Sequence, residues 1–307
     1  MNLPARGRAA GKVILLGEHA VVYGRPALAA GLAMDLEAEV TAGVGRLRLE
    51  SDRPELAADA RLARLVAEAA ALVGAPADGL VVRVRSELPA GAGLGSSAAL
   101  SVAVLRALAA ATGCALGGDE ELALGHRLEA IFHGHPSGIY PAAAALGGCF
   151  RFVRGEPPAV TPLRPARPLP LVIALGGRAR STGAAVGALR ARWEDERARY
   201  ERLFDEIAAV VDEGARAIEA GDLPALGRAF DRNQELLAAL GVSTPEIELV
   251  VDLARRAGAL GAKLTGGGAG GAVIALAPEA ERVAARLREA GVPTIVARVE
   301  AGEEKAA

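Results

Sequence analysis

The segment PAGAGLGSSAA, residues 89–99, has the composition of an anion-binding loop. Glycines at 91, 93 and 95 let the backbone turn so that successive N–H groups face one ligand. A long apolar helix is expected to follow, and its positive N-terminal end favours a phosphate. Ser96 and Ser97 can add hydroxyls, to the phosphate or to a magnesium ion. The segment lacks the lysine of a P-loop and the third glycine of a dinucleotide-binding turn, so a phosphate site of another class is predicted.

A second glycine-rich segment, TGGGAGG at residues 265–271, lies between two apolar runs. Five of its seven residues are glycine. Two interpretations are open: a flexible turn, or a backbone that approaches a ligand or the first loop closely. The density of residues without a Cβ atom favours the close approach.

A third segment, GKVILLGEHAVVYG at residues 11–24, makes the set of three segments specific enough to indicate a family. Together with the two glycine-rich segments it resembles the three motifs of the GHMP kinases, a superfamily of small-molecule kinases. Within that superfamily the sequence is most similar to the mevalonate kinases. The likeness extends from about residue 10 to residue 276 and includes three further segments: EAIFHGHPSGI (129–139), RST (180–182) and NQELLAALGVS (233–243).

The segments between these motifs show strand and helix patterns. Apolar and polar residues alternate over 35–50, which predicts an antiparallel hairpin. Further strands are expected at 12–16, 79–89 and 293–299, and on both sides of the second glycine-rich segment. Helices are expected at 57–74, from the first glycine-rich loop to residue 113, and at 118–132, about 185–220, 223–239 and 278–290.

The resemblance implies an α+β chain with the two-domain GHMP kinase fold. Its N-terminal domain would resemble domain 2 of ribosomal protein S5 and its C-terminal domain a ferredoxin-like α/β sandwich. A Pro- and Arg-rich segment near residue 168 marks the predicted boundary. Residues 1–168 would carry the phosphate loop, residues 169–307 would form the second domain, and ATP and Mg²⁺ would bind between them.

The resemblance also assigns roles to individual residues. Ser97 and Glu129 match the two Mg²⁺ ligands of the family, and Mg²⁺ usually takes only one or two oxygens from protein. Lys12 matches a catalytic lysine near the transferred phosphoryl group, where a fixed cation stabilises developing charge. The residues implied in nucleotide binding are Lys12, Ser86, Gly91, Ala92, Gly93, Leu94, Gly95, Ser96, Ser97, Gly266, Gly267 and Gly268.

On the acceptor side, the resemblance implies that Glu18, His19 and Thr182 bind the substrate, mevalonate or a close relative. Taken without the motif, a lone histidine is more often structural, and a glutamate such as Glu129 is more often a solvated surface residue. The motifs are what favour the functional interpretation.

The sequence departs from the family pattern in three ways. Ala10 replaces a proline before Lys12, and the second glycine-rich segment has exchanged small residues at Gly267 and Ala269. The third departure concerns chemistry, because Tyr140 stands where mevalonate kinases carry an aspartate, the proposed general base. A phenol has an ordinary pKa of about 10, against about 4 for a carboxylate, so a tyrosine is mostly neutral at pH 7.

This departure leaves three accounts open. Phosphoryl transfer can proceed without this base, because its loose transition state needs little early deprotonation of the nucleophile. Alternatively the acceptor differs, as in a mevalonate 3-kinase or another mevalonate-pathway enzyme of the superfamily. In the third account the chain is a nucleotide-binding pseudokinase. The retention of Lys12, Ser97 and Glu129 argues against the last.

Composition excludes several other classes. The formal net charge is −2, with 35 basic and 37 acidic residues, so nothing favours nucleic acid or an anionic membrane surface as a partner. Two cysteines in 307 residues form no disulfide framework and no metal-binding pattern. No apolar run approaches the roughly 20 residues needed to span a bilayer. A soluble cytoplasmic enzyme is expected, and the resemblance favours a homodimer.

Overall fold

The protein was analysed as a computed structural model, which describes residues 1–53, 56, 58–76, 78–89, 93–132, 139–176, 182–268 and 271–300. The side chains of residues 140–141 and 182–184 are outside that description. Contacts group the chain into two compact units. One comprises Met1–Lys12, Met34–Ala90 and Gly95–Gly147, and the other Val13–Ala33, Gly91–Leu94 and Gly148–Ala307.

The first sheet has six strands, in the order β3-β4-β2-β5-β6, with β1 also paired to β2. The long strand β2 changes partner along its length: residues 36–42 pair with β4 and residues 27–30 with β5. The strands are β1 (Ala5–Leu16), β2 (Ala27–Ala42), β3 (Arg48–Ser51), β4 (Leu80–Ser86), β5 (Cys149–Val153) and β6 (Ala159–Leu163).

The predicted hairpin over residues 35–50 is wrong. Strand β4 lies between β2 and β3, and β3 pairs with β4 in parallel, Arg48 opposite Val81. The alternating pattern correctly indicates extended chain, but the two segments, which are neighbours in sequence, are not neighbours in the sheet. Alternation reports which side chains face the core and does not identify the partner strand.

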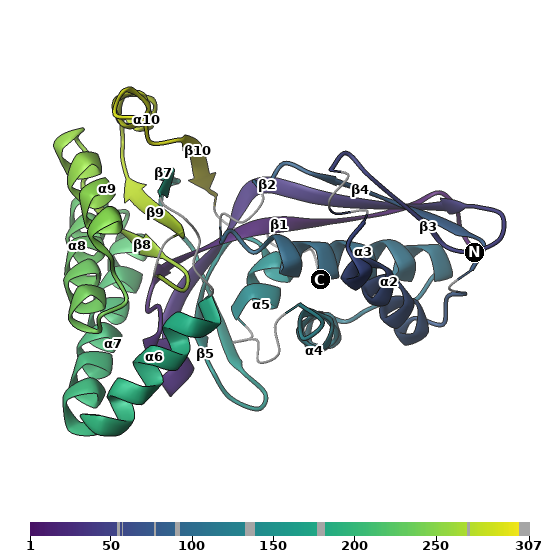
Figure 1. Cartoon of the computed structure of the whole chain (residues 1–307), viewed down its shortest axis with the longest axis horizontal. Helices are drawn as coiled ribbons and strands as arrows, with labels where there is room; N and C mark the ends of the chain where they lie inside the picture. Colours follow the sequence, from purple (N-terminus) through teal and green to yellow (C-terminus); the bar gives the residue numbers. More distant parts are fainter. Residues whose placement is uncertain are drawn as a thin grey trace. The chain divides into compact units, whose positions relative to one another are not determined.

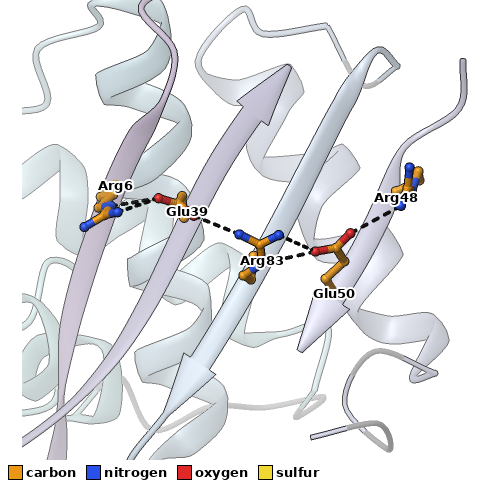
Figure 2. Close-up of polar contacts among 5 residues, drawn as sticks. All are labelled: Arg6, Glu39, Arg48, Glu50 and Arg83. Carbon is orange, nitrogen blue, oxygen red and sulfur yellow. Dashed lines mark hydrogen bonds and ion pairs between the residues drawn. The ribbon is translucent and has the colours of Figure 1, made fainter. Parts of the chain in front are cut away.

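Charged side chains lie on the exposed face of this sheet (Figure 2). Arg6 of β1 bonds Glu39 of β2 at 2.7 Å, and Glu39 also bonds Arg83 of β4 at 3.3 Å. Arg83 bonds Glu50 of β3 at 2.7 Å, and Glu50 reaches Arg48 at 3.3 Å. The five charges form a ladder across four strands, in which opposite signs alternate and each residue supports the register of its neighbours.

The other face of the sheet packs on helices α2 (Ala60–Leu72), α3 (Ser96–Thr112), α4 (Gly118–Glu129) and α5 (Ile139–Leu146) (Figure 1). Helix α3 is apolar around most of its circumference, and twelve of its seventeen residues are buried, as expected for a central helix. It approaches β1 so closely that a Cβ atom on Gly7 would lie 2.2 Å from the carbonyl oxygen of Ala103. Only glycine permits this contact.

The second unit contains a four-stranded sheet in the order β10-β7-β9-β8, in which each neighbouring pair of strands is antiparallel. Helices α8 and α9 pack against β8, and α10 packs against β7 and β10 (Figure 1). Besides strands of the first sheet, the second unit contains the short helix η1 (Ala20–Tyr23), β7 (Leu169–Gly176), α6 (Thr182–Asp195), α7 (Arg197–Ala220), α8 (Leu223–Ala239), α9 (Pro245–Arg256), β8 (Gly261–Thr265), β9 (Gly271–Leu276), α10 (Ala280–Glu289) and β10 (Thr294–Val299).

The single helix predicted for residues 185–220 is two helices, α6 and α7, separated at Glu196. No proline or glycine marks the break. A tertiary contact accounts for it: the ring of Tyr23 packs against Trp193 of α6 at 5.1 Å and against Phe204 of α7 at 4.3 Å. One aromatic side chain therefore contacts both helices at the corner, which local sequence does not reveal.

The remaining expectations agree well with the observed elements. The predicted helices at 57–74, 118–132, 223–239 and 278–290 correspond to α2, α4, α8 and α10, and the chain has the predicted mixture of α and β structure. Strand β7 starts at Leu169, next to the predicted domain boundary. The division into domains 1–168 and 169–307 stays a prediction. No helix in the described ranges is long and apolar enough to cross a membrane.

Candidate active site

The first glycine-rich loop leads directly into α3. Gly93 and Gly95 have positive φ angles of 71° and 76°, a conformation that strongly favours glycine. Gly95 is the N-cap of α3 and forms no side-chain cap, so the first N–H groups of the helix have no capping side chain. The predicted nucleotide-binding residues Gly91 and Ala92 lie outside the described residues, and the side chain of Leu94 is buried.

Three predicted site residues meet at the start of α3. The hydroxyl of Ser97 donates a hydrogen bond to Oε1 of Glu129 at 2.7 Å. Lys12 comes from β1 and packs against the loop so closely that a Cβ atom on Gly95 would lie 2.6 Å from its Cγ. Lys12 and Glu129 are 1% and 0% exposed, so a cation and a carboxylate share a site shielded from water.

The electrostatics of Glu129 depend on this burial. Loss of hydration raises the pKa of its carboxyl to about 7, and the Ser97 hydrogen bond and the charge of Lys12 oppose the shift only partly. Glu129 is also the last residue of α4, where the helix dipole disfavours a negative charge. A carboxyl group kept at a position where both burial and the helix dipole disfavour its negative charge is typical of a functional site.

A second group of predicted residues lies in the other unit, at the turn after β1. Gly17 has φ 97°, and a Cβ atom there would lie 2.6 Å from the backbone of Ala27. Glu18 is fully buried and pairs with Lys263 of β8. His19 is 5% exposed, and burial lowers the pKa of its imidazole to about 4 despite a hydrogen bond with the Gly267 backbone. The imidazole is therefore neutral at pH 7.

The second glycine-rich loop follows β8. Gly266 and Gly268 have φ angles of 87° and 67°. A Cβ atom on Gly268 would lie 2.4 Å from the carbonyl oxygen of Val242, and one on Gly266 would lie 4.0 Å from that of Gly93. The close approach to other backbone favours the interpretation of this loop as a packed element over that of a flexible turn. Ala269 lies outside the described residues.

For three other predicted residues the structure gives a position in the fold but no contact with the rest of the site. Ser86 ends β4, and its hydroxyl accepts a hydrogen bond from the Leu88 backbone at 3.2 Å, a local turn contact. Tyr140 lies in α5 and Thr182 begins α6, but their side chains lie outside the part of the chain that the structure describes. Their assignments stay predictions.

Sequence reasoning missed the residues that hold the turn after β1: Asn233 and Gln234 of α8, and Lys263 and Thr265 of β8. All four are buried polar side chains. A signal was available for Lys263, because it lies inside an apolar strand whose five residues are all buried, and a buried lysine requires a partner. The partner itself, Glu18, is 245 residues away.

Comparison with known proteins matches these features to one family. Residues 60–148 match the family described as GHMP kinases N terminal domain, and residues 215–293 match GHMP kinases C terminal. The mevalonate kinase of Pyrococcus horikoshii is 35% identical, over 94% of this chain and 93% of its own length. That of Methanothermobacter thermautotrophicus is 35% identical, over 87% of this chain and 88% of its own.

Solved structures agree with the fold. The L. major mevalonate kinase, crystallised in complex with R-mevalonate, is 28% identical and superimposes with a TM-score of 0.89 over 100% of both chains. The Methanococcus jannaschii mevalonate kinase, at 24% identity and a TM-score of 0.82, covers 96% of this chain and 98% of its own and shows the same fold. The predicted α+β GHMP fold is confirmed, and the chain belongs to the GHMP kinase family, in which the near-full-length relatives described above are mevalonate kinases.

Proposed function

We propose that the chain transfers the γ-phosphoryl group of ATP to a hydroxyl of mevalonate. GHMP kinases use ATP, and the relatives named above are mevalonate kinases over nearly their whole length. The observation that carries the proposal is the group formed at the N-terminus of α3 by the buried Lys12 and Glu129 and the half-buried Ser97. The positive charge of Lys12 suits a nucleotide phosphate, and the oxygens of Ser97 and Glu129 suit the Mg²⁺ that accompanies it.

The phosphates of ATP would occupy the loop from Gly93 to Ser97, with Gly91 and Ala92 completing the cradle. The uncapped N–H groups at the start of α3 favour an anion, and the helix end contributes a partial positive charge. Gly266, Gly267 and Gly268 would contact the nucleotide through their backbone, and Ser86 would lie at the edge of its site.

The residues present fit Mg²⁺. Ser97 and Glu129 offer hard oxygen donors already held 2.7 Å apart, and a carboxylate buried at the end of α4 gains from a cation that relieves the cost of its charge. Bound Mg²⁺ supplies charge neutralisation to the phosphates. In the described ranges no three His, Cys, Asp or Glu side chains come together as a metal site.

Lys12 would stabilise the negative charge that develops on the transferred phosphoryl group. Its ammonium is buried near Glu129, where electrostatic interactions are stronger than in water. Glu18, His19 and Thr182 would bind the acceptor. Tyr140 would not serve as a base at neutral pH, because a phenol with an ordinary pKa keeps its proton. The loose transition state of phosphoryl transfer tolerates this.

A direct assay tests the proposal. The purified protein is incubated with ATP, Mg²⁺ and mevalonate, ADP release is followed, and the product is identified by ³¹P NMR. Formation of the 5-phosphate supports the proposal, and the 3-phosphate points to the alternative acceptor hydroxyl. Tyr140→Asp is assayed in parallel. If only this variant turns over any pathway intermediate, the natural chain is not an active kinase.

Assembly as a homodimer is a further proposal that rests on family resemblance alone. Light scattering coupled to size-exclusion chromatography measures the mass directly. A mass twice that of the 31.1 kDa chain supports it, and the monomer mass contradicts it.

A further inference from the structure

His19 has an unusual backbone conformation. Its φ angle is 62°, and it is the one residue other than glycine with a positive φ in the part of the chain that the structure describes. For a side chain with a Cβ atom this conformation costs on the order of 1 kcal/mol or more, and it persists only where surrounding contacts enforce it. The contacts around His19 therefore show what the fold maintains at this turn.

The strongest of these contacts is a buried ion pair beside His19. Nζ of Lys263 donates to Oε1 of Glu18 and to the carbonyl oxygen of Leu264, the latter at 2.5 Å, and lies 5.9 Å from the ring centre of Phe230. Both charged side chains have 0% exposure. Burying two charges costs more than a well-packed apolar pair, so stability alone is a poor reason for such a pair.

Side-chain hydrogen bonds fix the chain on the N-terminal side of His19. Asn233 of α8 accepts a hydrogen bond from the Gly17 backbone at 3.2 Å. Thr265 of β8 bonds both backbone groups of Ile14, accepting from its N–H at 3.1 Å and donating to its carbonyl at 3.0 Å. Residues 14–18 are thus held by polar side chains from two elements far along the sequence.

Helix α8 and strand β8, which carry these side chains, are also bonded to each other. Gln234 of α8 accepts a hydrogen bond from the Leu264 backbone at 2.8 Å, and its amide donates to Ser243 at 3.0 Å and Glu248 at 2.8 Å. Helix α8 and strand β8 therefore form one support. The Gly17 backbone and the Glu18 side chain, at adjacent positions of the first motif, are both bonded to this support.

Two polar atoms at this turn still have bonding capacity. Nε2 of His19 and Nδ2 of Asn233 are buried and have no hydrogen-bond partner among the described residues. Buried polar atoms are rarely left unsatisfied unless water or a ligand completes them. One is an amide donor, and the other is a ring nitrogen that can accept from or donate to a hydroxyl, a combination that suits a small polyhydroxylated or carboxylated molecule.

We propose that Lys263 is a positioning residue that acts through Glu18: with Asn233, it holds the positive-φ turn at His19 so that Glu18 and His19 present one fixed arrangement to the acceptor alcohol. This inference rests on the proposed function for the identity of the acceptor. Lys263 itself takes no part in the chemical step, and its role is in acceptor recognition, separate from nucleotide binding.

A neutral replacement of the ion pair tests this role. Lys263→Met alone leaves the Glu18 carboxylate buried without its cation and is expected to unfold readily. The double variant Glu18→Gln/Lys263→Met removes both charges at similar volume and is expected to fold. The matched control is Glu206→Gln/Arg232→Met, which removes an exposed ion pair of 2.7 Å between α7 and α8 in the same unit.

Kinetics with mevalonate and ATP test whether the ion pair serves acceptor binding. Because Glu18 itself contacts the acceptor in this proposal, the φ angle of His19 in the crystal structure of the variant decides whether the pair acts by positioning the turn. In the folded Glu18→Gln/Lys263→Met variant, we expect the KM for mevalonate to rise about tenfold or more while the KM for ATP stays within about twofold. The control should match the natural protein in both constants. Unchanged mevalonate KM overturns the positioning role, and so does a parallel change of both KM values accompanied by lower thermal stability.

Failure of the proposed function gives a different result. If the natural protein shows no turnover of mevalonate, the proposed function is lost, and the crystal structures of the natural protein and the double variant then decide the positioning role. A φ angle at His19 that becomes negative in the variant supports the role of the ion pair. A φ that stays near its present value overturns it.

Discussion

Ser97 and Glu129 are joined by a hydrogen bond of 2.7 Å, although one lies in the first turn of α3 and the other ends α4. The bond links the positive end of one helix to a carboxylate at the negative end of another. Both residues match the Mg²⁺ ligands of the GHMP kinases by motif. The fold therefore holds the two oxygens next to each other.

Replacing Glu129 by Gln should make the ligand-free protein more stable at alkaline pH and much less active. The folded pKa of about 7 lies above the ordinary value of 4.5, so the carboxyl favours folding below pH 4.5 and loses this advantage as pH rises through 7. A difference of this size corresponds to on the order of 3 kcal/mol.

Chemical denaturation of both proteins without nucleotide at pH 5 and pH 8.5 measures this effect. We expect the stability gain of Glu129→Gln to be small at pH 5 and large at pH 8.5. Equal gains at both values would show that burial does not raise the pKa of Glu129.

Gly95→Ala should abolish activity by displacing Lys12. The new Cβ atom would lie 2.6 Å from Cγ of Lys12, and the residue has φ 76°. Gly74→Ala is a matched control, because Gly74 has φ 68° but no atom within 4 Å of a new Cβ. Both variants should lose about 1 kcal/mol of stability from backbone strain.

Only Gly95→Ala should lose kcat, by about a hundredfold or more, if Lys12 acts on the transition state. Steady-state kinetics and denaturation curves of the two variants separate the effects. Similar activity in both would mean that the position of Lys12 is unimportant for catalysis.

Lys12→Met tests the lysine itself. Removal of a fixed cation from a site of developing charge typically lowers kcat by about 10² to 10³-fold. Because Lys12 is 1% exposed, methionine preserves most of the packing, and the far-ultraviolet circular dichroism spectrum should not change. A variant that keeps more than a tenth of the natural kcat would contradict the role proposed for Lys12.

The charge ladder of the first sheet should contribute little stability at any single position. Arg83 is 42% exposed and Glu50 34%, and exposed pairs contribute about 0.2 to 1 kcal/mol. A double-mutant cycle with Arg83→Gln and Glu50→Gln, measured in 0.1 M and 1 M NaCl, should give a coupling within this range that shrinks at high salt. A salt-independent coupling above about 2 kcal/mol would show that the pair is effectively shielded from solvent.

The sequence was most informative where a local pattern determines the result. Helix α8 begins at Leu223 after the N-cap Asp222, as its spacing predicted, and the glycines at 93 and 95 have the positive φ angles that an anion-binding loop requires. The family motifs also identified Lys12, Ser97 and Glu129, which the fold brings together.

The sequence was least informative about partners distant along the chain. Nothing local indicates that β4 separates β2 from β3, or that Tyr23 packs at the corner between α6 and α7. The pairing of Glu18 with Lys263 is equally non-local. Each depends on tertiary packing, which a pattern of neighbouring residues does not encode.

The chain passes between its two compact units five times, after residues 12, 33, 90, 94 and 147. Two of these passages fall inside the strands β1 and β2. A single genetic crossover between two relatives would therefore combine fragments of both units rather than exchange one unit intact. The two units are expected to be inherited together, and chimeric enzymes will need several junctions to separate them.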